Sequence, residues 1–281
     1  PQIEPTLGHL FIEEVDKSAM DALKCALPAH HPPATVNRRL GLVRAILRFC
    51  RKRAHQSHVP YVPMERTTKQ PPKWYTEDER DRFLEGMFRL QPQWYTFYYL
   101  TVRLGLRVAE VYAISRSRLR DAPPQLIVDR AVQRGTTDRP AKLITRKNNE
   151  GYVLDLTDDI LDAIHWHIDQ GYAGPEFLFS RDGTFPRYID SYKRPAREVQ
   201  RALGLPELNH HALGRHSVAS QAVTHGHSIK AVQAQLGHRS EQSTHMYAHL
   251  GSGAQLRLVE ALAPVAPPHV NHASTSKKTG T

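Results

Sequence analysis

The chain of 281 residues has only two cysteines, Cys25 and Cys50, and neither lies in a CxxC pair or a zinc-finger spacing. This argues against a disulfide scaffold and a cysteine-based metal site, and it favours a reducing compartment. No apolar run approaches the ~18 residues that span a bilayer, and residues 1–10 lack the charged-then-apolar order of a secretory signal. We therefore expect a cytoplasmic protein without a membrane partner. An initial methionine is also absent, and a chain that begins at Pro1 is expected to be a piece of a longer protein.

Acidic residues are outnumbered by basic ones. The chain has 28 Asp and Glu against 38 Lys and Arg, so its formal charge is +10 with the 17 histidines neutral. Such an excess of positive charge favours a polyanionic partner, although a basic protein that is merely soluble would have the same composition.

Much of this charge lies in residues 34–54, ATVNRRLGLVRAILRFCRKRA. Apolar residues recur there at helical spacing, and seven cations stand between them without one acidic residue. The pattern predicts a helix that packs on one face and is basic on the other. A solvated face is the simplest explanation, but phosphate contact accounts better for cations without acidic partners. The contacts are expected from Arg38, Arg39, Arg44 and Arg48.

Proline marks a boundary in the chain. The stretch VPYVPMERTTKQPPKWY contains four prolines, which cannot continue a helix and favour an extended linker. We expect a helical domain at residues 1–62, a linker at 63–75 and a larger domain at 76–263. The tail at 264–281 has too little apolar content to pack and is expected to be disordered.

The periodicity of apolar residues predicts a mainly α fold with a small antiparallel β-sheet. Thr76 followed by Glu79 forms a capping-box pattern ahead of a helix. Between residues 125 and 156 the period falls to two in QLIVDRAVQ, AKLITRK and YVLDL, with NNEG as the turn between the last two. Helical patterns are seen in LFIEEVDKSAMDALKCAL, EDERDRFLEGMFRL, YTFYYLTVRLG, DDILDAIHWHI, DSYKRPAREVQRAL, SVASQAVTH and SIKAVQAQL.

Three separated stretches combine arginine, histidine and tyrosine. They are TVRLGLRVAEVYAIS around Arg107, HHALGRHSVAS around Arg215, and LGHRSEQSTHMYAHL with His238 and Tyr247. Their order and spacing resemble the tyrosine recombinases, the phage integrase family. In that family a GLR-x-x-E turn, a lysine on a β-hairpin and a His-x-x-Arg box precede an LGH and then a tyrosine at a nearly fixed distance. The resemblance covers nearly the whole chain.

The resemblance implies a site-specific DNA recombinase, an integrase of a phage or mobile element. Such an enzyme cuts and rejoins double-stranded DNA through a 3′-phosphotyrosine intermediate and needs no cofactor, metal or ATP. It also implies a helical core-binding domain, a mixed α+β catalytic domain and a homotetramer on DNA, with a directionality or DNA-bending protein as a further partner. The segment SGAQLRLVEALAPV would dock on a neighbouring subunit.

Phosphate chemistry explains these residue types. Attack on a phosphodiester builds charge on two non-bridging oxygens, which the rigid guanidiniums of Arg107 and Arg215 are suited to meet. A phenol has an ordinary pKa of about 10, so Tyr247 needs stabilised negative charge or a base to act as the nucleophile. The departing 5′-oxygen needs a proton, which a lysine can supply.

The lysine and histidine assignments are less direct. Lys147 resembles the family's hairpin lysine, but Lys142 and Arg146 lie nearby. The middle box reads HALGR, so three residues separate its histidine from its arginine, and Ala212 holds the strict His-x-x-Arg register. Because helix positions i+3 and i+4 share a face, His211 still reaches the phosphate if the turn around Gly214 is rewound.

Other functions stay open at this point. The many histidines near the C-terminus invite a metal site, but HExxH is absent and nearby carboxylates are scarce, so no metal is expected. A type IB topoisomerase would share the nucleophile and rejoin the same strand. The altered box also fits a catalytically degenerate DNA-binding accessory or regulatory protein.

Overall fold

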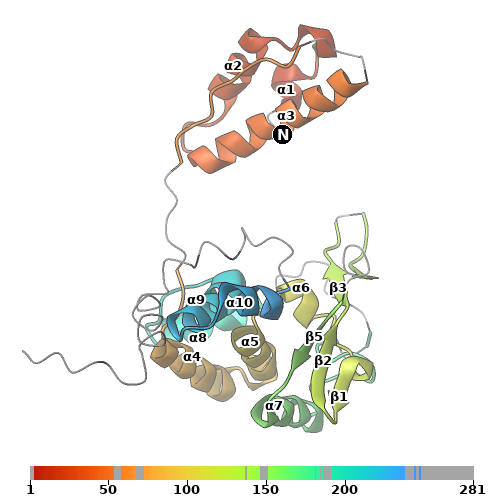
Figure 1. The fold of residues 1–281 in the computed structure, drawn as a ribbon, viewed down its shortest axis with the longest axis vertical. Coiled ribbons are helices and arrows are strands. Elements are labelled where there is room, and N and C mark those ends of the chain that lie inside the picture. The colour runs from red at the N-terminus through yellow and green to blue at the C-terminus, as the bar shows by residue number, and fades with distance from the viewer. Residues whose placement is uncertain are drawn as a thin grey trace, which may run out of the picture. The chain divides into compact units, whose positions relative to one another are not determined.

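A computed structural model of the chain describes residues 3–53, 58–67, 73–136, 138–145, 151–180, 182–183, 185, 191–237, 244 and 247. These residues form mainly α-helices with small antiparallel sheets, which confirms the predicted fold class (Figure 1). The chain divides into two compact units, Pro1–Pro71 and Pro72–Thr281. In the part of the chain that is described, no helix is both long and apolar enough to cross a membrane.

The first unit is helical. The continuous helix predicted for residues 10–27 is wrong, because the segment is divided into a 3₁₀ turn and the helix α2. Asp16 starts α2, since its side chain accepts a hydrogen bond of 2.8 Å from the backbone N–H of Ala19. The helices of this unit are α1 (Ile3–Leu7), η1 (Ile12–Glu14), α2 (Lys17–Ala26) and α3 (Pro33–Lys52).

Helix α3 is the predicted basic helix, and its outer surface is more varied than expected. Its buried face is confirmed by Leu40, Val43 and Leu47, which lie in the core of the unit together with α2 residues. The expectation that the rest of the helix is basic is incomplete. Three large apolar side chains form a second stripe, about a third of a turn from the buried one, and are roughly half exposed: Leu42, Ile46 and Phe49.

The helices of the second unit are close to the predicted ones. Helix α4 starts with the predicted capping box, in which Thr76 and Glu79 bond each other's backbone N–H groups. Helix α5 begins before the predicted start, at Pro92, whose missing N–H costs nothing in a first turn. The helices are α4 (Glu77–Leu90), α5 (Pro92–Leu104), α6 (Val108–Val111), η2 (Arg116–Arg118), α7 (Asp158–Asp169), α8 (Lys193–Ala202), η4 (Ala212–His216), α9 (Ser217–Thr224) and α10 (Ile229–Gln235).

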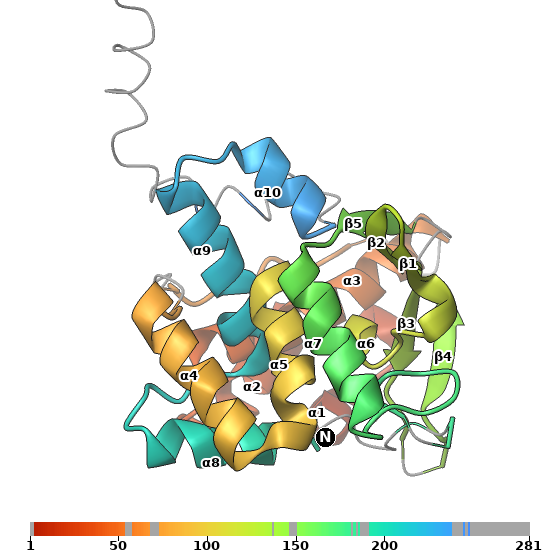
Figure 2. The same cartoon turned by 90° about the horizontal axis from the view of Figure 1, so that it is seen from below.

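Helix α5 is the centre of the second unit. It contacts α4 on one side and α7 on another, and the three helices lie side by side in Figure 2. Its side chains are buried over most of its length, including Phe97, Tyr98, Leu100 and Thr101. The fixed position of α5 matters for function, because its C-terminal end and the turn after it contribute to the candidate site.

The strands form two small sheets. β2 (Pro124–Val128) pairs with both β1 (Leu119–Asp121) and β5 (Tyr152–Asp155), whereas β3 (Arg130–Gln133) pairs with β4 (Lys142–Thr145), all antiparallel. The predicted hairpin that NNEG would close is wrong, because β4 and β5, as described, have different partners and are not paired with each other. A period of two indicates strands, but it does not specify which strand pairs with which.

Candidate active site

The structure describes four of the residues proposed for catalysis: Arg107, His211, Arg215 and Tyr247. Lys147 and His238 lie outside the described residues, as do residues 252–265, predicted as a docking segment, and residues 264–281, predicted as a disordered tail.

Arg107 is held at the start of α6 by a buried carboxylate. Its backbone N–H donates to Glu110 Oε2 at 2.9 Å, and its Nη1 donates to Glu110 Oε1 at 2.9 Å. The Tyr152 hydroxyl donates to the same carboxylate at 3.4 Å. Glu110 is 3% exposed, whereas the Arg107 side chain is 43% exposed. The glutamate therefore positions Arg107 and leaves part of its guanidinium free to meet a ligand, a role that its sequence spacing alone does not distinguish from a surface ion pair.

Arg215 is the most deeply fixed cation of the site. It is 1% exposed, and it donates from Nη1 to the Gly105 carbonyl at 2.9 Å and from Nη2 to the Leu236 carbonyl at 2.6 Å. Both carbonyls stand at helix C-termini, where a positive charge is favoured. Burial, with the charge of Arg107 acting in the same direction, lowers the pKa of Arg215 to about 10. The guanidinium is still charged at neutral pH, and its two hydrogen bonds fix its orientation.

The altered histidine box forms a π-helical turn, η4. The backbone N–H of Ser217 donates to the carbonyl of Ala212, five residues earlier. A π turn accommodates one residue more than an α turn, so it absorbs the residue by which HALGR exceeds His-x-x-Arg. The expected rewinding around Gly214 is thus observed. A Cβ on Gly214 would stand 2.8 Å from both the carbonyl oxygen and Cγ2 of Thr101, so α5 leaves room only for glycine.

Of the two residues considered for the box position, His211 lies toward the charged groups and Ala212 does not. Ala212 is 7% exposed and belongs to the hydrophobic core. The His211 ring packs edge to face on His216, with 4.5 Å between ring centroids. Partial desolvation lowers the pKa of His211 to about 4, and the positive charges of His216, Arg215 and Arg107 act in the same direction. His211 is therefore neutral at neutral pH.

Tyr247 is buried beside Arg215 and is 2% exposed. Its hydroxyl is hydrogen-bonded to Nδ1 of His216. Burial raises the pKa of Tyr247 to about 12, against the opposing charge of Arg215. Its ring packs in a small apolar cluster with Ala219, Val223, Val232 and Leu236. The sequence prediction missed His216, because only the π turn and the fold bring it to the tyrosine.

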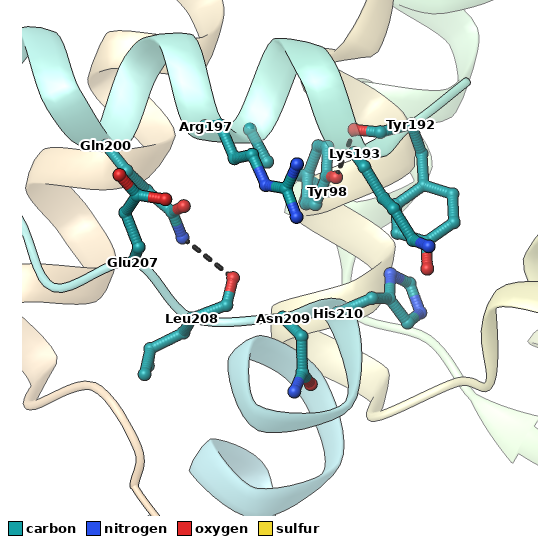
Figure 3. Close-up of a pocket in the computed structure, with 10 residues that line it drawn as sticks. Tyr98, Tyr192, Lys193, Arg197, Gln200, Glu207, Leu208, Asn209 and His210 are labelled. Atoms are coloured by element: carbon teal, nitrogen blue, oxygen red, sulfur yellow. Dashed lines mark hydrogen bonds between the residues drawn. The ribbon is translucent and has the colours of Figure 1, made fainter. Parts of the chain in front are cut away.

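His210 has a different environment from its neighbour in sequence. It is 5% exposed, and its Nε2 donates to the Leu106 carbonyl at 3.2 Å. It lines a pocket of about 200 Å³, toward which Lys193 and Arg197 project from α8 (Figure 3). Over the described ranges, no group of three or more His, Cys, Asp or Glu side chains is arranged to hold a metal ion. The hydrogen bond of His210 to Leu106 supports the turn before α6.

The buried His210 predicts a dependence of stability on pH. Burial lowers its pKa to about 4 from an ordinary 6.5, so the unfolded chain binds the proton more tightly. The free energy of unfolding should fall by about 3 kcal/mol as the pH decreases from about 6.5 to 4, and should be regained above that window. His210→Gln keeps a donor for the Leu106 carbonyl but does not titrate. Urea unfolding across this range should show a smaller pH dependence for the variant, and equal dependences would contradict this role.

Two guanidiniums, two imidazoles and a buried phenol, gathered on a mainly helical unit, form a site suited to phosphodiester chemistry. A sequence model of the phage integrase family matches residues 73–252, which is more than half of the chain. The chain therefore belongs to the phage integrase family, and the resemblance to tyrosine recombinases is confirmed.

Two curated relatives are both tyrosine recombinases named XerC. That of Nitrobacter winogradskyi is 29% identical over 166 residues, which cover 57% of this chain and 46% of the relative. That of Corynebacterium glutamicum is 25% identical over 272 residues, which cover 91% of this chain and 81% of the relative. The chain spans about half the length of several relatives, such as those of N. winogradskyi, Bradyrhizobium diazoefficiens and Rhodospirillum centenum.

Solved structures share the fold at low sequence identity. The integrase of transposon Tn1549 in complex with a circular intermediate DNA has a TM-score of 0.78 and 17% identity, and the match covers 92% of this chain and 88% of that one. The site-specific recombinase XerH bound to its difH substrate has a TM-score of 0.63 and 17% identity, covering 89% and 70%.

Proposed function

We propose that the chain is a site-specific DNA recombinase that cuts and rejoins DNA through a 3′-phosphotyrosine intermediate. The observation that supports it best is the placement of a buried tyrosine phenol beside the fixed guanidinium of Arg215, with Arg107 close enough to act on the pKa of Arg215. Paired guanidiniums stabilise the charge that develops on a phosphodiester under attack. The proposed nucleophile is Tyr247.

The other residues take complementary roles. His211 is neutral at neutral pH and has an N–H to donate to a phosphate oxygen, next to the guanidiniums. Lys147 is proposed to protonate the departing 5′-oxygen, and His238 to complete the set of phosphate donors. These two assignments rest on the sequence motifs. A free 5′-hydroxyl of a partner strand then attacks the phosphotyrosine and reverses the step.

DNA as the substrate is supported by similar solved structures and by the positive charge of the first unit. The Tn1549 integrase and XerH structures are DNA complexes. In the first unit, no ion pair is seen within the described residues for the four arginines predicted to contact phosphates, whereas Lys24 is paired with Glu65. Arginines without anionic partners are suited to phosphates. They are Arg38, Arg39, Arg44 and Arg48.

The proposed function implies a role for each domain and an oligomeric state. Residues 1–62 bind DNA as a core-binding domain, residues 63–75 link the two domains, and residues 76–263 are the catalytic domain. We propose a homotetramer on double-stranded DNA, assisted by a directionality or DNA-bending protein, in recombination of a mobile element. Recombinase relatives favour this function over a nicking-closing topoisomerase or an inactive accessory protein.

The test is covalent trapping on a suicide DNA, in which a nick next to the cleavage site lets the 5′-hydroxyl fragment diffuse away. Candidate sites come from DNA flanking the gene. We expect a protein–DNA complex that survives denaturation, with a chelator present so that metal-dependent nucleases are silent. A mobility shift without covalent linkage would identify an accessory protein. Covalent linkage without strand transfer between two duplexes would identify a topoisomerase.

A further inference from the structure

One hydrogen bond of the site involves a residue outside the family motifs. His216 follows the box arginine directly, and its Nδ1 bonds the hydroxyl of Tyr247. We propose that His216 positions the nucleophile and accepts its proton, so that Nδ1 holds the phenol at rest and takes the phenolic hydrogen as the oxygen attacks phosphorus. This inference rests on the proposed function.

The surroundings of Tyr247 leave few alternatives for the proton. The tyrosine is 2% exposed, so its hydroxyl has little access to bulk water. An accepting Nδ1 requires the tautomer of His216 with hydrogen on Nε2, which then points its only proton away from the phenol. The other charged or titratable groups of the described site are either always protonated, already paired or turned to His216: Arg107, Glu110, Tyr152, His211 and Arg215.

The π turn explains how His216 reaches this position. On an α-helix, residues i and i+4 share a face, so in a His-x-x-Arg-His sequence both histidines project together. In this chain the two histidines are five apart, and a regular α-helix would place them about 140° apart around its axis. The η4 turn restores the pairing, because His211 and His216 lie with ring centroids 4.5 Å apart. His211 thereby buttresses the ring that holds the nucleophile.

The step balances in atoms and charge. The phenolic O–H bond of Tyr247 breaks, its proton goes to Nδ1 of His216, and its oxygen forms the new bond to phosphorus. The bond from phosphorus to the 5′-oxygen breaks, and that oxygen leaves with the electron pair and takes a proton from the general acid, proposed as Lys147. Rejoining reverses each transfer, so no other reactant is needed.

The protonation states of His216 and Tyr247 at neutral pH are compatible with this role. Burial, with the charge of Arg215 acting in the same direction, lowers the pKa of His216, so the imidazole is neutral and can accept a proton. The pKa of Tyr247 is raised to about 12, so the phenol does not ionise by itself. A neutral base in contact with a buried phenol is the arrangement that general-base catalysis needs.

The experiment is single-turnover cleavage of the suicide DNA from pH 5 to 8. The wild-type rate should fall on the acid side as His216 becomes protonated, at a pH below 6.5, the ordinary pKa of histidine. His216→Ala should be slower by roughly a hundredfold or more and should lose this acid limb. His216→Asn places an amide oxygen near the position of Nδ1 and so keeps the hydrogen bond without the basicity. It should bind DNA and fold normally, yet remain slow and independent of pH in this range.

Two controls make the outcome specific. His227→Ala removes an exposed histidine that follows α9, whereas η4 precedes that helix. This variant should leave the rate and its pH profile unchanged. A substrate with sulfur in place of the departing 5′-oxygen needs no general acid, so it should not rescue the His216 variants. Rescue by that substrate, or a wild-type rate and pH profile in His216→Ala, would overturn the inference. Absence of any covalent complex with the wild-type protein would instead overturn the proposed function.

Discussion

Tyr247→Phe is expected to abolish the covalent protein–DNA complex and to leave DNA binding nearly unchanged. The substitution removes only the attacking oxygen, and loss of a nucleophile typically costs a factor on the order of 10⁴ or more. The phenyl ring stays in the apolar cluster of α9 and α10. The lost hydrogen bond to His216 should lower the free energy of unfolding by only about 1 kcal/mol.

The measurement pairs covalent trapping with a gel shift on the same DNA. Tyr172→Phe is a matched control, because it removes a hydroxyl from a half-buried tyrosine that follows α7 and has no role in the proposed site. It should form the covalent complex at the wild-type rate. If Tyr247→Phe were still linked to DNA, another residue would be the nucleophile. If it lost binding and linkage equally, the tyrosine would have a structural role.

The sequence predicted the features that depend on local interactions. The capping box of Thr76 and Glu79 is a contact three residues apart, and it places the start of α4 correctly. The buried stripe of α3 follows from helical periodicity alone. The family motifs likewise named Arg107 and Arg215, because their order along the chain is a property of sequence. Such features need no knowledge of what the segment packs against.

Features set by tertiary contacts could not be predicted in this way. The pairing of β5 with β2 rather than β4 depends on which strands meet in space. The role of Glu110 depends on its burial, since the same spacing at the surface would give a weak ion pair. The contact of His216 with Tyr247 joins residues 31 apart and requires a π turn. No rule of sequence spacing predicts a contact between residues that far apart in the chain.

Gly214 of the altered box is a further feature that depends on tertiary contacts. The sequence shows one residue too many between His211 and Arg215, but not whether the helix bulges or the histidine is displaced. The structure shows that the helix bulges, because the Ser217 N–H donates to the Ala212 carbonyl. Close approach of α5 then requires a residue without Cβ at position 214, against Thr101. The bulge brings His211 and His216 together, and the glycine lets the bulge pack against α5.

His211→Ala should slow cleavage by roughly a hundredfold or more. Loss of one donor to a developing phosphate charge costs on the order of 2 to 4 kcal/mol, and about 1.4 kcal/mol corresponds to a factor of ten in rate. The His211 ring is exposed beside Arg215 and His216, so its removal leaves no buried cavity. The folded state should therefore be nearly as stable as that of the wild type, and the loss should appear in the rate alone.

Moving the histidine to the strict box register should not repair this defect. Ala212 is 7% exposed in the hydrophobic core, so Ala212→His forces a polar ring into packed space and should destabilise the fold by about 1 to 3 kcal/mol. The double variant His211→Ala, Ala212→His should then be as slow as His211→Ala and less stable. Single-turnover cleavage of a suicide DNA, combined with urea unfolding of each variant, measures both effects. An unimpaired His211→Ala enzyme, or a double variant restored to the wild-type rate, would show that the turn presents position 212 rather than His211 to the phosphate, while leaving the assignments of Tyr247 and the two arginines intact.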